Sequence, residues 1–154
     1  MLNGSGLRVV LWVAVCSHHC KGCQNPITWD ANNGIPFDEN AKEELFEELN
    51  QSYCSGITFS GGDPLDDANF DVIYNLVKEI KTKFPNKNIW LYTGYTWEEI
   101  YYYKKLRILL YIDVLVDGPY IEEQRDISLK WVGSKNQRII DVQASLKKDE
   151  LVLL

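Results

Sequence analysis

The chain has 154 residues, enough for one domain that buries a hydrophobic core without covalent cross-links. A hydrophobic fraction of 45% and a charged fraction of 25% are ordinary for a globular protein. The formal net charge of −6 argues against nonspecific nucleic-acid binding, so no nucleic-acid partner is expected. The longest apolar run, at 9–15, is too short to span a bilayer, so no membrane partner is expected either.

The first half of the chain begins with a strand pattern and continues with a long loop. Residues 7–15 are β-branched and almost wholly apolar, which predicts a strand buried on both faces. The loop over 16–37 is rich in Cys, Asn, Gly and Pro. A helix is predicted over 39–51, with Asp38 as its N-cap and apolar side chains along one stripe.

Strand and helix patterns then alternate to the end of the chain. Further strands are predicted at 56–60, 88–93, 111–117 and 138–142, and further helices at 66–84 and 97–109. Thr96 and Glu99 are spaced as a capping box for the last of these helices. The polar stretch between the last two strands has no clear pattern, and the apolar tail 151–154 either docks on the body or frays.

The alternation of strands and helices predicts an α/β fold: a mostly parallel sheet with crossover helices. Five strands cannot close a full eight-stranded barrel, so we expect an open, partial (βα) barrel in a single domain over 1–154. An open side would suit a macromolecular substrate.

Four irregular motifs follow predicted strands. They are the cysteine loop after the first strand, SGGDP at 60–64, TGY at 93–95 and DGPY at 117–120. The carboxyl ends of parallel strands form the edge at which ligands bind in α/β proteins. The agreement of four positions therefore predicts a functional site at this edge.

The loop CSHHCKGC holds three cysteines, Cys16, Cys20 and Cys23, in the spacing Cys-x3-Cys-x2-Cys. No export signal precedes them, so we expect a reducing, cytoplasmic setting in which clustered thiols serve metal or redox chemistry rather than disulfides. Three thiolates in one tight loop predict a [4Fe–4S] cluster with one iron left open. Gly22 would let the backbone pass close to a ligand.

A structural zinc site is the alternative use of these thiols. It needs a fourth ligand, which Cys54, His18 or His19 could supply. Cys54 falls near the start of the second predicted strand, at the far end from the loop, and is expected to be a small buried side chain. His18 and His19 are expected as polar residues on an exposed turn.

The stretch from Cys16 to Cys23 resembles the cluster motif of the radical S-adenosylmethionine superfamily. The resemblance implies that Cys16, Cys20 and Cys23 ligate a [4Fe–4S] cluster and that S-adenosylmethionine chelates the open iron. Reductive cleavage of S-adenosylmethionine would then give methionine and a 5′-deoxyadenosyl radical. The partial barrel would accordingly be of the radical-SAM type.

Segment 60–63 resembles the Gly-Gly-Glu segment with which that superfamily binds the methionine amino group. The resemblance implies that Ser60, Gly61, Gly62 and Asp63 hold this part of the ligand, with Asp63 in place of the usual glutamate. Taken without the cysteines, the same segment is typical of a tight turn into a helix capped by Asp66.

A narrower resemblance extends from about residue 4 to residue 143. The segments CKGCQNPITW, SGGDPL, LYTGYTWEE, IDVLVDGPY and GSKNQRIID resemble the glycyl-radical-enzyme activases that serve anaerobic ribonucleotide reductase. The resemblance implies that the large reductase subunit is the partner and that a glycine near its C-terminus receives the radical. It also implies a reductant such as flavodoxin or ferredoxin.

The resemblance assigns roles to further residues at the strand ends. Ligand contact is implied for Gly22, Gln24, Thr93, Gly94 and Tyr95, and placement of the peptide glycine for Asp117. Tyr95 could instead be an ordinary rim aromatic, and Asp117 a turn former before Pro119.

Three other functions remain open from the sequence. The first is an activase for another glycyl-radical enzyme, such as pyruvate formate-lyase. The second is a zinc or iron–sulfur interaction module without catalysis, and the third is a radical enzyme that acts on a small molecule. The short chain disfavours the last, which usually needs more residues to cover its substrate.

Overall fold

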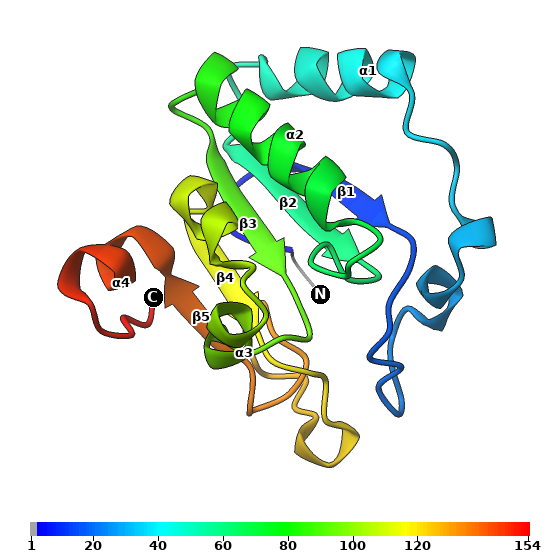
Figure 1. Ribbon diagram of the computed structural model, residues 1–154, viewed down its shortest axis with the longest axis vertical. Coiled ribbons are helices and arrows are strands. Elements are labelled where there is room, and N and C mark those ends of the chain that lie inside the picture. The colour runs from blue at the N-terminus through cyan, green and yellow to red at the C-terminus, as the bar shows by residue number, and fades with distance from the viewer. Residues whose placement is uncertain (1–2) are drawn as a thin grey trace.

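The computed structural model describes residues 3–154 and contains a five-stranded sheet (Figure 1). The strands are β1 (Arg8–Val13), β2 (Gly56–Gly61), β3 (Asn88–Tyr92), β4 (Val114–Asp117) and β5 (Arg138–Asp141). They lie in the sheet in chain order; β1 to β4 run parallel and β5 runs antiparallel to β4. Within the described residues β1 and β5 do not pair, so the sheet is open. The predicted α/β class with a mostly parallel sheet is confirmed.

The helices lie between successive strands, except for the last, which follows β5. They are α1 (Glu39–Leu49), α2 (Phe70–Lys83), α3 (Trp97–Tyr102) and α4 (Val142–Lys148), together with the short 3-10 segments η1 (Pro26–Trp29), η2 (Ala31–Asn33), η3 (Leu106–Tyr111) and η4 (Glu122–Gln124). Figure 1 shows α2 lying across one face of the sheet. Over residues 3–154, no helix is long and apolar enough to cross a membrane.

Both faces of the central strands are covered, so the polar Thr58 and Ser60 of β2 are buried as well as the apolar side chains that alternate with them. Ile57 and Phe59 of β2 are fully buried in the main core with the α2 stripe that includes Val77 and Ile80. On the opposite face, Trp90 packs with side chains of β4 and of the connection between β4 and β5. The core therefore holds β2 and β3 rigidly and fixes where their carboxyl ends lie.

The first strand differs from its prediction. It is only half-buried, and its Trp12 is 49% exposed. The apolar run suggested burial on both faces, but β1 lies at the edge of the sheet with β2 as its neighbour. The prediction of burial on both faces was wrong because the local apolar pattern does not specify the order of strands in the sheet.

Two helix boundaries also differ from prediction. Helix α2 begins at Phe70 rather than at residue 66, because 64–69 form turns, and its N-cap is Asn69 rather than Asp66. Helix α3 ends at Tyr102, and Lys104 then adopts a left-handed φ of 57° that breaks the predicted 97–109 helix.

The C-terminal segment docks on the sheet. Leu153 forms a bridge with Ile140 of β5, and Leu154 N donates to Ile139 O at 2.9 Å. Helix α4, which precedes this segment, was not predicted. Its N-cap is Asp141, whose side chain accepts a hydrogen bond from Ala144 N.

The capping box of α3 forms as predicted and offers a test of local stability. The Thr96 hydroxyl accepts from Glu99 N, while the Glu99 carboxylate accepts from Thr96 N at 2.8 Å. We expect Thr96→Ala to lower the free energy of unfolding by about 1 kcal/mol in urea denaturation. Thr82→Ala, at an exposed position of α2, is the control and is expected within about 0.5 kcal/mol of wild type. Equal losses in both variants would contradict a stabilising cap.

Candidate functional site

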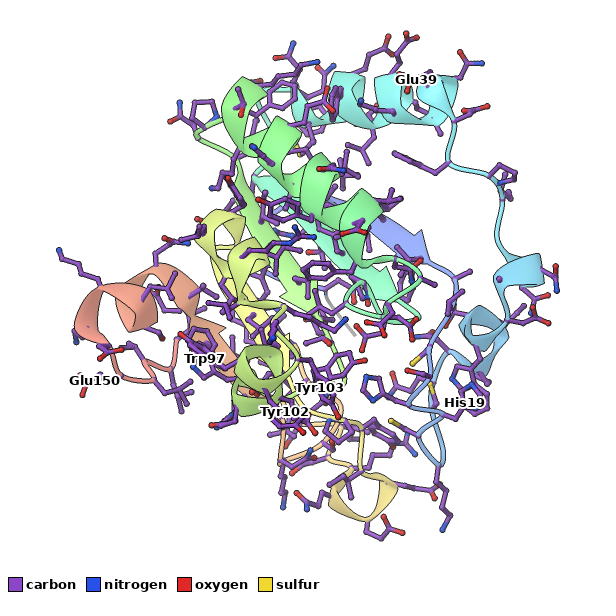
Figure 2. All side chains as sticks on the ribbon, in the orientation of Figure 1. His19, Glu39, Trp97, Tyr102, Tyr103 and Glu150 are labelled. Atoms are coloured by element: carbon purple, nitrogen blue, oxygen red, sulfur yellow. The ribbon has the colours of Figure 1, made fainter. Side chains whose placement is uncertain are left out.

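A cavity of about 320 Å³ lies at the carboxyl edge of the parallel strands. Its lining comes from all four strand-end motifs, and includes Cys16, Cys20, Cys23, Gln24, Ser60, Gly61, Gly62, Asp63, Thr93, Gly94 and Gly118. Figure 2 shows the sulfur atoms of this region close to the labelled His19. The expectation that the four motifs meet at one edge of the sheet is therefore confirmed.

The three clustered cysteines are free thiols, partly buried, and all three line the cavity. Burial raises the pKa of Cys16 and of Cys20 above the ordinary thiol value. Asn25 N donates to Cys23 Sγ at 3.4 Å, so the loop already directs a backbone donor at one sulfur. Cys54 is 5% exposed in the main core, just before β2 begins, and thus lies away from these thiols.

The donor set fits an iron–sulfur cluster better than a single metal ion. Nowhere in 3–154 do three or more His, Cys, Asp or Glu side chains converge where they could hold one ion. A cluster takes its thiolates on different irons, so its ligands surround it rather than meet at a point. The zinc alternative also lacks its fourth ligand, because His18 faces Asp63, His19 stacks on Trp29, and Cys54 is in the core.

The glycine pair at the end of β2 is required by a close approach of two backbones. A Cβ on Gly61, which has a φ of 103°, would lie 2.6 Å from Val13 O, and one on Gly62 would lie 2.3 Å from Val15 O. Gly62 N also donates to Val13 O at 2.7 Å. These glycines therefore bring the end of β2 directly against the start of the cysteine loop.

The Asp63 carboxylate is almost completely buried, with 1% of its side chain exposed. It accepts hydrogen bonds from Leu65 N at 2.8 Å and from Thr93 Oγ1 and Gly94 N at 2.9 Å. His18 Nε2 lies 2.8 Å from its Oδ2, at an angle poor for a hydrogen bond. These internal partners occupy both oxygens, but Asp63 also lines the cavity, so its contact with a ligand stays a prediction.

His18 is a site residue that the sequence did not reveal. It lines the cavity instead of lying on an exposed turn. The neighbouring Asp63 carboxylate raises the pKa of His18, against the opposing effect of burial. His19, by contrast, points to Trp29, and the two rings stack at 4.6 Å. Only the spacing of a histidine between two clustered cysteines hinted at a role for either residue.

Tyr95 lies behind His18 rather than among the residues that line the cavity. Its ring meets the His18 ring edge-on at 4.6 Å and contacts the Tyr103 ring at 5.6 Å. Burial raises the pKa of Tyr95 to about 12. This placement favours a supporting aromatic over the predicted ligand contact.

Asp117 also lies outside the cavity lining. Its buried carboxylate accepts from Arg138 Nε at 3.0 Å, from Arg138 Nη2 at 2.5 Å and from Trp97 N at 2.8 Å. The ion pair with Asp117 raises the pKa of Arg138 further above its ordinary value. The carboxylate thus ties β4, β5 and α3 together, and the role of Asp117 in placing a peptide glycine stays a prediction.

Gly22 faces the connection between β4 and β5 instead of the cavity. It has a φ of 69°, and a Cβ there would lie 2.7 Å from Glu122 Oε1. Lys21 Nζ lies 3.5 Å from Glu122 Oε2 and 3.6 Å from Glu123 Oε1. The cysteine loop thus lies beside this connection, from which Tyr120 and Gln137 also line the cavity.

Comparisons with known proteins also indicate an iron–sulfur protein. The family described as "4Fe-4S single cluster domain" matches residues 2–140. A protein of Enterobacteria phage T4 is 48% identical over 138 residues, covering 90% of this chain and 86% of that one. Proteins of Vibrio cholerae and Escherichia coli K12 are 42% and 40% identical, covering 90% and 89% of this chain and 90% of each relative. All three are named anaerobic ribonucleoside-triphosphate reductase-activating protein. No solved structure matches.

Proposed function

Because the chain belongs to the family of anaerobic ribonucleoside-triphosphate reductase-activating proteins and carries a 4Fe-4S single cluster domain, we propose that it generates a glycyl radical on such a reductase. The observation that carries the proposal is the convergence of three free, closely spaced thiols on the cavity at the strand ends. The proposed partner is the large reductase subunit, through a glycine near its C-terminus. A flavodoxin or ferredoxin is the proposed reductant.

The proposed cofactors are a [4Fe–4S] cluster and S-adenosylmethionine. Cys16, Cys20 and Cys23 would hold the cluster, and the backbone donor at Asn25 would stabilise the Cys23 thiolate. When bound, the two cofactors would supply the reductive cleavage of a sulfonium to methionine and a 5′-deoxyadenosyl radical. Burial keeps the Cys16 and Cys20 thiols protonated without metal, so loading would release protons.

The remaining wall of the cavity offers contacts for S-adenosylmethionine. Its volume of about 320 Å³ is at the small end of the range usual for ligand pockets. We propose that Gln24, Ser60, Gly94 and the glycine pair border this ligand. Tyr120 and Gln137 line the cavity from the connection between β4 and β5.

We propose that the open sheet is a partial barrel of the radical-SAM type, in one domain over residues 1–154. Four parallel strands, a fifth antiparallel strand and cavity-lining loops at one edge support this assignment. Because β1 and β5 do not pair with each other within residues 3–154, the sheet stays open, and we propose that a protein substrate approaches from this opening. The docked reductase would complete the wall and exclude water from the radical.

The test uses anaerobically reconstituted protein, reduced with dithionite and supplied with S-adenosylmethionine. About four irons per chain and formation of 5′-deoxyadenosine are expected. A glycyl EPR doublet should then appear on anaerobic ribonucleotide reductase and not on pyruvate formate-lyase. Bound zinc, or iron without cleavage under any reductant, would contradict the proposal, and a signal on pyruvate formate-lyase alone would reassign the partner.

A further inference from the structure

Two carboxylates that follow β2 hold the cysteine loop at consecutive residues. Ser17 N donates to Asp66 Oδ2 at 3.1 Å, and His18 Nε2 lies 2.8 Å from Asp63 Oδ2. The first contact joins the loop only to the turn before α2. The second reaches a carboxylate that also accepts hydrogen bonds from the turn after β3, so the two contacts connect the loop to different segments.

Asp63 joins three segments that are distant in the sequence. Asp63 itself follows β2. Its carboxylate accepts hydrogen bonds from Thr93 Oγ1 and Gly94 N, which follow β3, and contacts His18 of the cysteine loop. With 1% of the side chain exposed, water cannot replace a lost partner. Displacing any one partner is therefore expected to move the carboxylate and so change its contacts with the others.

The His18 ring also fills the space between the loop and β3. A Cβ on Gly94 would lie 2.5 Å from the ring, so the ring touches the Gly94 backbone. Tyr95 packs edge-on against the other side at 4.6 Å. His18 is thus held by a carboxylate beyond β2 and by a backbone segment and an aromatic ring beyond β3.

We propose that His18 is a positioning residue that, through Asp63, fixes the cysteine loop against the turn at Thr93 and Gly94. His18 stands between Cys16 and Cys20, so a displacement of its ring moves both thiols relative to the wall formed by β2 and β3. The inference rests on the proposed function only for its catalytic consequence. Its structural part concerns residues of this chain alone.

Three variants separate the contact from the rest of the loop. His18→Leu fills the space of the ring with an apolar side chain but removes the nitrogen that contacts Asp63. His18→Gln retains a side-chain N–H that can reach the carboxylate. His19→Asn is the matched control, because His19 faces Trp29 and its φ of 47° is one that Asn tolerates.

The first readout is catalysis by the reconstituted protein with S-adenosylmethionine. We expect His18→Leu to retain the wild-type iron content and to lower kcat for 5′-deoxyadenosine about 10- to 100-fold, with KM changed less than about threefold. His18→Gln should recover most of the loss, and His19→Asn should stay within about twofold of wild type. Wild-type kcat in His18→Leu, or equal losses in the Leu and Gln variants, would overturn the proposal.

The second readout is amide hydrogen exchange in the peptide that contains Gly94 N, which needs no turnover. This amide should exchange at least about tenfold faster in His18→Leu, and at the wild-type rate in His19→Asn. Unchanged exchange in His18→Leu would refute the positioning role even if the wild-type protein cleaves S-adenosylmethionine. Accelerated exchange alongside a wild-type protein that cleaves nothing would instead refute the proposed function alone.

A second route to the same displacement covers the case in which His18→Leu does not fold. Gly94→Ala places a methyl group 2.5 Å from the His18 ring and should push it away from Asp63. The same loss of kcat with retained iron is expected. Wild-type kcat in Gly94→Ala would count against the proposal.

Discussion

Replacing Cys20 with alanine is expected to reduce bound iron from about four atoms per chain to less than about one and to abolish 5′-deoxyadenosine formation. A cluster held by three thiolates already lacks one protein ligand, so two thiolates cannot retain it. The side chain is only partly buried in a loop, so its loss should leave the fold intact. Iron and sulfide analysis, the optical spectrum and product chromatography together measure the effect.

The matched control is Cys54→Ala. Cys54 is 5% exposed and belongs to the main core, so this variant should keep its iron and its activity. It should instead lower the free energy of unfolding by about 1 kcal/mol, because a small buried group is deleted. Loss of iron in Cys54→Ala, or full iron in Cys20→Ala, would place the cluster on a different set of thiols.

Local pattern was sufficient for most of the fold. The apolar runs located every strand, and the stripe that includes Ile73 and Ile80 located α2. Parallel strands then had to bring their carboxyl ends to one edge, which placed the cysteine loop, the glycine pair and the turn after β3 around one cavity. These features depend on neighbours in the sequence and on one topological rule.

The features that were missed depend on contacts between distant segments. The edge position of β1 follows from strand order, and the early end of α3 coincides with Lys105 turning inward to pair with Asp67 and to lie over the rings of Phe70 and Tyr95. Neither a run of apolar residues nor a helical period contains this information. Helix α4 is only seven residues long, too short for its period to be recognised.

The sequence likewise does not specify where a side chain at a strand end points. Asp63 and Asp117 both follow strands at the ligand edge, and both were predicted to contact a ligand or a substrate. In the structure each carboxylate points to partners inside the protein, Asp63 to Thr93 and Gly94, and Asp117 to Arg138. A carboxylate at a strand end therefore identifies the site without specifying whether it contacts the ligand or supports the wall.

Arg138→Leu is expected to lower the free energy of unfolding by about 3–5 kcal/mol, the largest loss of stability that we predict from one substitution. The Asp117 carboxylate has no exposed surface, and Arg138 donates to it through Nε at 3.0 Å and through Nη2 at 2.5 Å. Removing the guanidinium leaves a buried charge with Trp97 N as its remaining donor. Equilibrium denaturation in urea measures the effect.

Glu98→Gln is the matched control, since Glu98 binds the same guanidinium but is 66% exposed. Its loss should stay within about 1 kcal/mol, as for other exposed ion pairs. The double variant Asp117→Leu with Arg138→Leu should recover much of the stability, because no unpaired charge remains.

The variant Asp117→Asn tests activity separately. Once its activity is corrected for the fraction of folded protein, it should activate the reductase nearly normally. Full stability with lost activation in Asp117→Asn would instead support the predicted substrate-contacting role.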